Sequence, residues 1–214
     1  QDIFGGYVSD GWTYQTVETF FEEGGARAYV SRVVDESAVE ADFDLLDAYP
    51  SGSVCATLLA SGTGTWANDG GLTVQVTNPS VSSFKVLIRL NGTLVWSSQT
   101  HTSVANFVEE VNNDSTAALY LTASAGPSTS IPAVKAETTF AGGTNGSTLV
   151  DADVSTALDA FTSNLGPGAV CAPGFTSQTV REALLSHAED NNRIAIMAFG
   201  KDDTVQDVLA DVTD

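Results

Sequence analysis

Catalysis by an activated serine, threonine or cysteine needs a neighbouring base, most often a histidine, and this chain of 214 residues has two histidines, His101 and His187. His187 falls beside the apolar stripe of a helix expected over 179–190, and His101 precedes another expected helix, so neither follows the end of a strand. The chain also lacks the GxSxG sequence of a nucleophile elbow. We therefore expect both histidines at the surface or at the edge of a core. We expect no catalytic residue and no enzymatic activity.

The sequence contains no complete motif for binding a metal ion or a phosphate group either. Asp151 and Asp153 are separated by one residue, but the further acidic and glycine positions of a calcium loop are missing. The start of a helix, with Asp151 as its N-cap, explains both carboxylates, because the helix dipole favours negative charge there. No GxGxxG or GxxxxGK[ST] pattern occurs. We therefore expect turns, and neither a cofactor nor a metal site, at the glycine pairs Gly5-Gly6, Gly24-Gly25, Gly70-Gly71 and Gly142-Gly143.

The two cysteines, Cys55 and Cys171, lie far apart, without CxxC spacing and without a flanking histidine. Free cysteines are among the most buried residues in proteins. We therefore expect two small apolar core residues, and a disulfide or a reactive thiol is the alternative.

Three tryptophans could stack against sugars, because indole rings present large apolar faces. The alternative, which we favour, is that they anchor a core or an interface; they are Trp12, Trp66 and Trp96. Glycosylation would matter only in a secreted protein, and a predicted turn already explains the first of the three Asn-x-Ser/Thr triplets, which begin at Asn91, Asn113 and Asn145.

The charge balance limits the partners of the protein. Eight basic and 27 acidic residues give a net charge of −19. No basic stripe is available to neutralise nucleic-acid phosphates, so we expect no nucleic-acid binding. No segment approaches the ~18 consecutive apolar residues of a membrane helix, so we expect no membrane span. A hydrophobic content of 43% is sufficient for a buried core in one large domain or two small ones.

Apolar periodicity divides the chain into three regions. In the first, a helix that ends at Gly24-Gly25 is predicted by an apolar face of Tyr14, Val17, Phe20 and Phe21. The apolar run 26–34 predicts a buried strand. Residues 35–47 hold six acids and no base, and they predict an acidic connector with a solvated face rather than a cation site.

The second region, 53–139, is rich in strands, which we predict over 54–59, 72–77, 84–90, 93–97 and 117–123. Asn91-Gly92 between two β-prone runs predicts a type I′ hairpin, because both central residues of that turn need positive φ. Thr102 or Ser103 can cap one helix, whose apolar positions are Val104, Phe107, Val108 and Val111. Strands with one short helix predict a β-sandwich-like module.

The third region, 140–214, alternates helices, which begin near Asp151, Thr179 and Thr204, with strands over 169–172 and 193–199. Thr179 and Glu182 have the spacing of a capping box. Such alternation predicts a mainly parallel sheet with helical crossovers. The predicted fold is therefore of the α+β or α/β class. An α/β domain formed by 1–52, which includes the acidic connector, and by 140–214 is interrupted by an inserted β-sandwich-like module at 53–139.

Four segments in a fixed order carry a more specific signal. FFEEGGARAYVSRV at 20–33 resembles the pattern FF-x-x-GG-x-x-x-YV-x-RV, and ASGTGTWAN at 60–68 is similar to A-x-x-PGTWGN. FAGGTNG at 140–146 is similar to L-x-GG-x-DG, and CAPG at 171–174 is similar to x-x-PG. Together they resemble the contractile phage tail sheath proteins. The chain departs from these motifs at Thr63, Ala67 and Asn145, where the family has Pro, Gly and often Asp.

The resemblance implies a β-sandwich domain beside an α/β domain of subtilisin-like topology that has no protease activity. It implies a structural subunit of the contractile tail sheath of a bacteriophage or a phage-tail-like injection machine. Such subunits form a six-fold helical array around a tail tube and drive contraction by repacking, without nucleotide hydrolysis. The implied partners are other copies of the sheath protein, the tail tube protein and the baseplate. The implied location is the virion, after assembly in the host cytoplasm.

The resemblance also implies that the chain is the central fragment of a subunit, truncated within its second α/β part and without the terminal arms that add strands to neighbouring subunits. We therefore expect this chain alone to be monomeric. In the full protein, acidic faces should meet the few cations, and assembly should weaken at low salt; the cations include Arg27, Arg32, Arg89, Arg181 and Arg193.

Two other functions remain as alternatives to a sheath subunit. One is a carbohydrate- or receptor-binding surface module of a virion, which would need Trp66 or Trp96 exposed in a groove. The other is an α/β hydrolase or protease, which would need a base beside a nucleophile.

Overall fold

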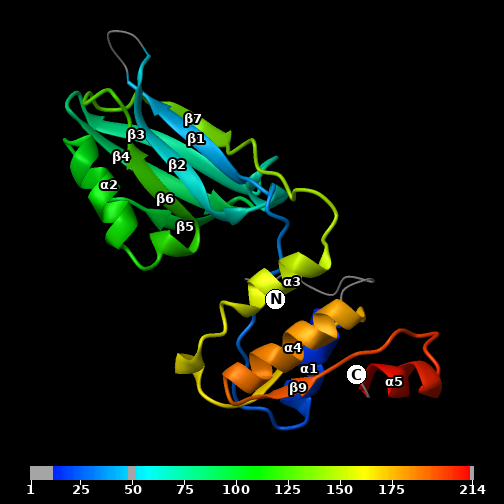
Figure 1. Cartoon of the computed structure of the whole chain (residues 1–214). Helices are drawn as coiled ribbons and strands as arrows, with labels where there is room; N and C mark the ends of the chain where they lie inside the picture. Colours follow the sequence, from blue (N-terminus) through cyan, green and yellow to red (C-terminus); the bar gives the residue numbers. More distant parts are fainter. Residues whose placement is uncertain (1–11, 48–51, 213–214) are drawn as a thin grey trace. The chain divides into compact units, whose positions relative to one another are not determined.

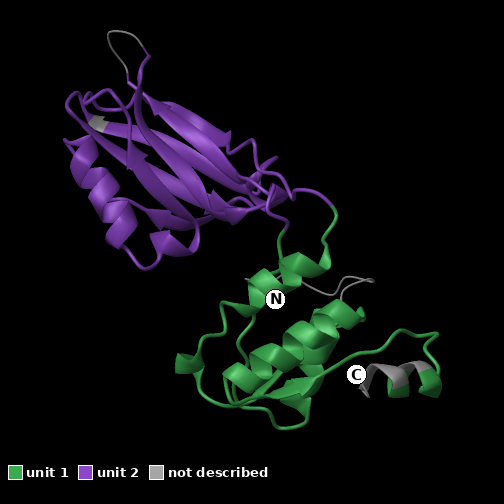
Figure 2. Cartoon of the chain, viewed as in Figure 1, with its two compact units in different colours: residues 1–34, 148–214 green, residues 35–147 purple. Residues whose placement is uncertain are grey.

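The computed structural model describes residues 12–47 and 52–212, and the chain forms two compact units (Figure 1, Figure 2). Unit 2 comprises residues 35–147, and unit 1 combines 1–34 with 148–214. These limits differ from those of the predicted inserted module. Unit 2 begins at 35 instead of 53 and ends at 147 instead of 139. The turn predicted at Gly5-Gly6 lies outside the described residues.

Unit 2 contains two antiparallel sheets. The three-stranded sheet has the order β1-β2-β6 and comprises β1 (Glu40–Leu46), β2 (Val54–Thr63) and β6 (Leu121–Ala125). The four-stranded sheet has the order β5-β4-β3-β7 and comprises β3 (Leu72–Ser80), β4 (Ser83–Leu90), β5 (Thr93–Ser97) and β7 (Lys135–Thr139). Buried side chains from both sheets belong to one hydrophobic cluster. The two sheets therefore share a core, as in a sandwich.

The core faces of β3 and β4 follow the alternation of their sequences. Every second residue is buried, and the antiparallel register places Val74 opposite Ile88. Asn91 (φ 49°) and Gly92 (φ 78°) form the turn from β4 into β5. The hairpin predicted from the Asn-Gly pair is confirmed.

Strand β1 corrects the prediction of an acidic connector over 35–47. Its sequence EADFDLL alternates acidic and apolar residues, so that Ala41 and Leu45 are buried in the core while Asp42 and Asp44 are exposed. One face of an antiparallel sheet can lie in water. The acidic residues therefore form the solvent face of a strand.

Helix α2 (Val104–Asn113) buries most of the apolar face predicted for it: Val104, Phe107 and Val111. Ser103 occupies the N-cap position, but its side chain makes no capping hydrogen bond, so the predicted cap is not formed. The strand predicted over 117–123 begins later, because a 3₁₀ helix, η2 (Ala117–Leu119), precedes β6. A further 3₁₀ helix, η1 (Thr65–Ala67), follows β2.

Unit 1 has shorter elements and a smaller core. They are α1 (Trp12–Glu22), α3 (Asp151–Leu158), the 3₁₀ helix η3 (Ser163–Leu165), β8 (Ala169–Cys171), α4 (Gln178–Asp190), β9 (Ile194–Ile196) and α5 (Val205–Val212). The core contains Val154, Leu158, Val170, Val180, Leu184 and Ala188. Helix α4 begins after Ser177, whose Oγ accepts the Val180 N–H at 3.3 Å. The predicted cap at Thr179 is therefore two residues late.

The described residues do not form the mainly parallel sheet that we predicted for the α/β domain. β8 and β9 pair in parallel over three residues each, but both larger sheets are antiparallel. The run 26–34, predicted as a buried strand, forms no strand and is largely exposed. An apolar run becomes a strand only where another strand pairs with its N–H and C=O groups, and no strand of 12–47 or 52–212 pairs with 26–34.

Candidate functional site

His101 is a structural residue at the edge of the unit 2 core. Its Nε2 is hydrogen-bonded to the Glu110 carboxylate of α2, and its ring packs beside Phe84 and Phe107 with centroid distances of 6.0 and 5.9 Å. The same carboxylate accepts the Gln99 N–H at 3.0 Å. The pair therefore attaches the segment before α2 to the helix, which agrees with the predicted place of His101 at a core edge.

His187 lies at the end of α4 and is held by Arg193. The distance from Arg193 Nη1 to His187 Nε2 is 2.8 Å. Burial and the Arg193 charge both lower the pKa of His187, so its neutral ring can accept a hydrogen bond from the guanidinium. Arg193 also donates to Phe161 O at 2.6 Å and Thr162 O at 2.7 Å. Arg193 thus ties the start of β9 to the loop after α3.

Asp151 and Asp153 belong to the first turn of α3, as expected, but Asp151 is not the N-cap that we predicted. The N-cap is Val150, so Asp151 is the first helical residue and not the cap. Asp153 accepts the Val150 N–H at 2.8 Å. The carboxylates therefore satisfy the helix start. Within 12–47 and 52–212, the structure contains no group of three or more His, Cys, Asp or Glu residues that could hold a metal ion.

The cysteines are both free thiols, and only one of them fits the prediction of a core residue. Cys55 is fully buried, and its thiol donates to Leu45 O at 3.0 Å. Cys171 is exposed on β8. The prediction of a core residue is therefore wrong for Cys171, which lines an open pocket beside residues of α1 and α3.

Trp66 and Trp96, which belong to unit 2, do not form an exposed surface on which a sugar could stack. Trp96 belongs to the core, with 6% of its surface accessible, and Trp66 packs partly buried against the same core with its Nε1 donating to Gly62 O at 2.9 Å. Trp12, by contrast, is 62% exposed on α1. These positions remove the aromatic groove that the carbohydrate-binding alternative requires in unit 2.

Hydrogen bonds join two of the sequence motifs, 60–68 and 140–146, within unit 2. We call the contact between Asn68 and Gly143 the clasp. Asn68 Nδ2 donates to Gly143 O at 2.8 Å, and Gly143 N–H donates to Asn68 Oδ1 at 3.1 Å. Beside this pair, Thr65 N–H donates to Asn145 Oδ1 at 3.1 Å. A Cβ atom at Gly143 would overlap Gly64 O. The motif residues at 60–68 and 140–146 therefore join the end of β2 to the segment through which the chain leaves unit 2.

Asp35 secures the first and last turns of unit 2, a role that sequence reasoning missed. Its carboxylate accepts the hydroxyl and the N–H of Ser37 and, at 2.8 Å, the N–H of Ser147. These bonds, the Ser37 hydroxyl first, lower the pKa of Asp35. A Cβ at Gly146 would overlap the same carboxylate. The Asp-x-Ser pattern of an Asx turn is the sequence signal that could have indicated this contact.

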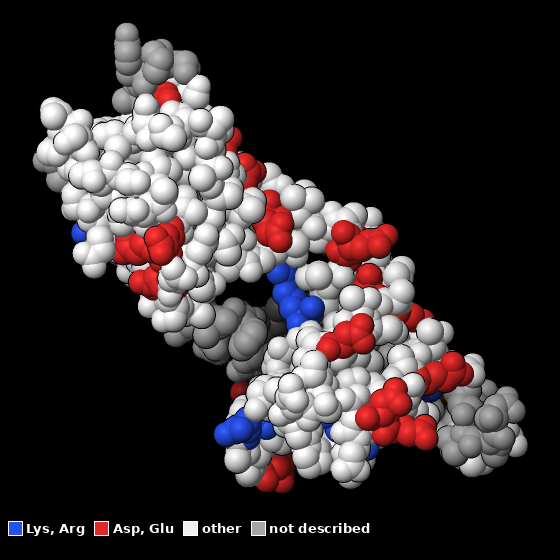
Figure 3. All heavy atoms as spheres, turned by 60° about the vertical axis from the view of Figure 1, so that its left-hand side comes forward, with Lys and Arg blue, Asp and Glu red and all other residues white. Residues whose placement is uncertain are grey.

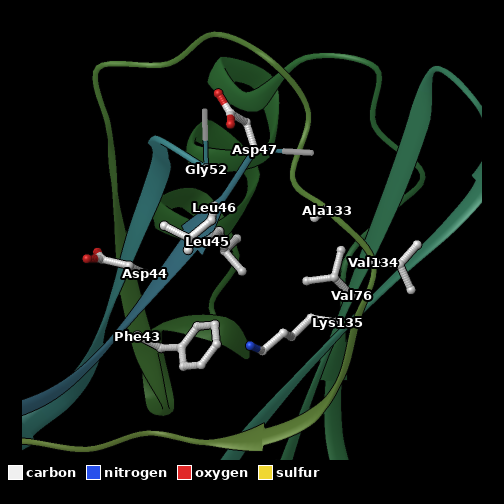
Figure 4. A pocket seen from close by; sticks show the side chains of 10 residues that line it. All are labelled: Phe43, Asp44, Leu45, Leu46, Asp47, Gly52, Val76, Ala133, Val134 and Lys135. Atoms are coloured by element: carbon white, nitrogen blue, oxygen red, sulfur yellow. The ribbon is translucent and has the colours of Figure 1, made fainter. Parts of the chain in front are cut away.

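The cleft in unit 2 offers few free polar groups. It has a volume of about 280 Å³, and Figure 4 shows the Lys135 ammonium pointing into it toward the Phe43 ring. Asp47, at its rim, already accepts the Ser53 N–H at 3.0 Å and the Ser128 hydroxyl at 2.5 Å. The cleft is therefore mostly an apolar gap beside β1, without convergent catalytic groups.

Apolar side chains are exposed on several elements of unit 1. On β9, Ile194 and Ile196 are 71% and 56% exposed. Helix α1 buries none of its residues, and Phe20 and Phe21 of its predicted inner face lie exposed. Parallel sheets are normally covered on both faces. We call β9 and α1 the open elements of unit 1; they are candidates for contact with other chains.

Acidic side chains appear on the visible face of both units, with few basic ones among them (Figure 3). Three arginines are already engaged within their own unit. Arg89 lies 3.6 Å from the Glu137 carboxylate, Arg181 is buried with its guanidinium over the Phe199 ring, and Arg193 binds the carbonyls described above. Three of the arginines that we expect to face acidic surfaces of other copies therefore also have partners within their own unit. No helix in 12–47 or 52–212 has the length and apolar content to cross a bilayer.

No protein-family profile and no curated protein matches the sequence. Among solved structures, the chain is similar to a sheath tail protein from Listeria innocua, with 18% identity and a TM-score of 0.52 over 74% of this chain and 31% of that one. A sheath tail protein from Desulfitobacterium hafniense is 14% identical, with a TM-score of 0.47 over 75% of this chain and 33% of that one. The chain thus spans about a third of the length of these proteins. The first likeness shows that this chain has the fold of part of a sheath tail protein.

Proposed function

We propose that this chain is part of a structural subunit of a contractile tail sheath, from a phage or a phage-tail-like injection machine. The observation that carries the proposal is the fold shared with the sheath tail protein of Listeria innocua over 74% of the chain. The four ordered motifs support it independently, and two of them form the clasp between Asn68 and Gly143. In this proposal, unit 1 is part of a subtilisin-like α/β domain, and unit 2 is the inserted β-sandwich.

The proposed role is assembly around a tail tube, followed by repacking of subunits when a baseplate triggers contraction. Free energy released at the interfaces would supply the work. The open elements of unit 1 support this role, because exposed apolar surface on β9 and α1 is suited to contact with neighbouring copies. In a helical array, each contact joins two different patches. The proposed location is the virion, with assembly in the host cytoplasm.

The net charge of −19 makes assembly sensitive to salt. Stacked copies bring many carboxylates close together, and added ions screen their repulsion. We therefore expect the sheath yield of the longer subunit, measured by sedimentation, to fall as the ionic strength is lowered. A yield that stays constant from low to high salt would contradict this electrostatic argument.

The proposed function is tested by expressing the longer subunit that contains this chain and imaging it by negative stain. We expect striated tubes from the longer subunit, whereas the present 214 residues should remain monomeric in size-exclusion chromatography with light scattering. A longer subunit that stays monomeric at every salt and protein concentration would overturn the proposal.

A further inference from the structure

The sequence places a glycine directly after an asparagine or an aspartate at four positions: Asp10-Gly11, Asp69-Gly70, Asn91-Gly92 and Asn145-Gly146. Asparagine is one of the chemically labile residues of proteins. A following glycine favours its reaction, because a residue without a Cβ atom lets its own nitrogen approach the preceding side chain. Asp10-Gly11 lies outside the described residues. The structure gives the other three pairs different surroundings.

Asn91-Gly92 is the least restrained of these pairs. Both residues are exposed and form the turn between β4 and β5. The ladder ends with Leu90 opposite Thr93, so neither central residue of the turn pairs with a strand. Within the described residues, no hydrogen bond of the Asn91 side chain or of the Gly92 N–H is found. A Cβ atom at Gly92 would meet no atom within 4 Å, so no other segment crowds this glycine.

Asn145 is exposed as well, but hydrogen bonds hold its side-chain amide. Its Oδ1 accepts the Thr65 N–H at 3.1 Å, and its Nδ2 donates to Thr65 Oγ1 at 3.4 Å. A Cβ atom at Gly146 would overlap the Asp35 carboxylate, so a negative charge lies beside this glycine. Such a charge disfavours removal of a proton from the Gly146 N–H. The fold therefore opposes a reaction between Gly146 and the Asn145 side chain in two ways.

In the pair Asp69-Gly70, the glycine nitrogen is already engaged. The Gly70 N–H donates to Thr139 Oγ1 at 2.8 Å. The next residue, Gly71, packs so closely that a Cβ atom there would overlap Trp66 O. The Gly70 nitrogen can turn toward the Asp69 side chain only if this hydrogen bond is lost. The three pairs thus look alike in the sequence and differ in the tertiary structure.

We propose that Asn91 is a site of spontaneous deamidation in the folded protein, and that the fold protects Asn145. The Gly92 nitrogen attacks Cγ of Asn91 and forms a new C–N bond. The bond between Cγ and the side-chain nitrogen breaks, and ammonia leaves with the proton of the Gly92 N–H. Water then opens the cyclic imide: hydrolysis at Cγ leaves aspartate, and hydrolysis at the backbone carbonyl leaves isoaspartate, in which the chain continues through Cγ. This inference does not depend on the sheath proposal.

The reaction changes the hairpin chemically as well as electrostatically. Both products add a negative charge to a protein of net charge −19. Isoaspartate also inserts a methylene group into the backbone of a two-residue turn, so Leu90 and Thr93 can no longer keep their register. β5 is an edge strand and carries the buried Trp96. Isoaspartate at position 91 should therefore loosen β5 from the sheet.

The test follows both asparagines in the folded 214-residue chain during incubation at mildly alkaline pH, where hydroxide removes the Gly92 N–H proton. Trypsin places Asn91 and Asn145 in separate peptides, 90–135 and 136–181, which are analysed by liquid chromatography and mass spectrometry. Asn91 should gain about 1 Da and separate into aspartate and isoaspartate forms. It should react at least about fivefold faster than Asn145, since one hydrogen bond contributes about that factor.

Two controls separate the effect of the fold from that of the local sequence. In urea, where the fold is lost, Asn91 and Asn145 should react at similar rates. Asn91→Asp removes the reacting amide, so the folded variant should release less ammonia than the wild type. The proposal is overturned if Asn91 stays intact in the folded chain while it reacts in urea, or if folded Asn145 reacts as fast as Asn91. A rate difference that persists in urea, or undiminished ammonia release from Asn91→Asp, also overturns it.

Discussion

Removal of the Asn68 side-chain amide should measurably destabilise unit 2. The amide forms two hydrogen bonds with the Gly143 backbone, at 2.8 and 3.1 Å, and it is partly shielded from water. A hydrogen bond of this kind contributes about 1 kcal/mol to the free energy of unfolding. Asn68→Ala should therefore lower that free energy by about 2 kcal/mol, the sum of two such bonds. Asn68→Asp keeps the Oδ1 acceptor but places a carboxylate oxygen against the Gly143 carbonyl oxygen, so its loss should be at least as large.

The assay is equilibrium unfolding in urea, followed by fluorescence, since Trp66 and Trp96 both report on unit 2. The Asn68→Ala midpoint should fall without a change in slope. Asn106→Ala is the control, and it should differ from the wild type by no more than about 0.5 kcal/mol, as is usual for exposed positions. A midpoint for Asn68→Ala equal to that of the wild type would refute the stabilising role of the clasp.

Two further predictions concern titration and thiol reactivity. The pKa of Asp35 is lowered by the Ser37 hydroxyl and by the Ser147 N–H, so the folded state favours the charged carboxylate and loses stability as the pH falls below about 4. Asp35→Asn should therefore lose less stability than the wild type on acidification, and identical acid-unfolding curves would contradict this. A thiol reagent should label Cys171 before Cys55, because Cys171 is exposed whereas burial excludes the reagent from Cys55 and raises the pKa of its thiol to about 11. Partial burial raises the pKa of the Cys171 thiol as well, so its labelling should accelerate as the pH is raised, whereas Cys55 should react only on unfolding. Rapid labelling of both thiols in the native chain would show that the core around Cys55 opens readily.

Elements with short-range signals could be predicted from their own residues. The β4–β5 hairpin depends on Asn91-Gly92, because positive φ at both positions is a local requirement. The buried face of α2 follows from the helical spacing of its apolar residues, as Phe107 and Val111 show. The resemblance of the ordered motifs to sheath proteins agrees with the fold of the solved sheath tail protein.

The candidate contacts were less predictable, because they join residues that are distant in the sequence. The motifs containing Asn68 and Gly143 are recognisable, but neither indicates that the two residues bond to each other. The acidic run 35–47 predicts a connector that includes Asp35, whereas the bond of Asp35 to Ser147 exists only because the two ends of unit 2 meet. Asn112 of α2 has no distinguishing sequence signal, because its two hydrogen bonds to the Ala123 backbone depend on the position of β6.

The sequence by itself determined the acidic charge, the hairpin turn, the helical faces and the order of the motifs. Only the tertiary structure decided that 40–46 is a strand, that 26–34 is not, and that parallel pairing within the described residues is confined to β8 and β9. The physical reason is that a strand is completed by backbone groups of another segment. A local pattern of apolar residues is the same whether or not that partner lies beside it.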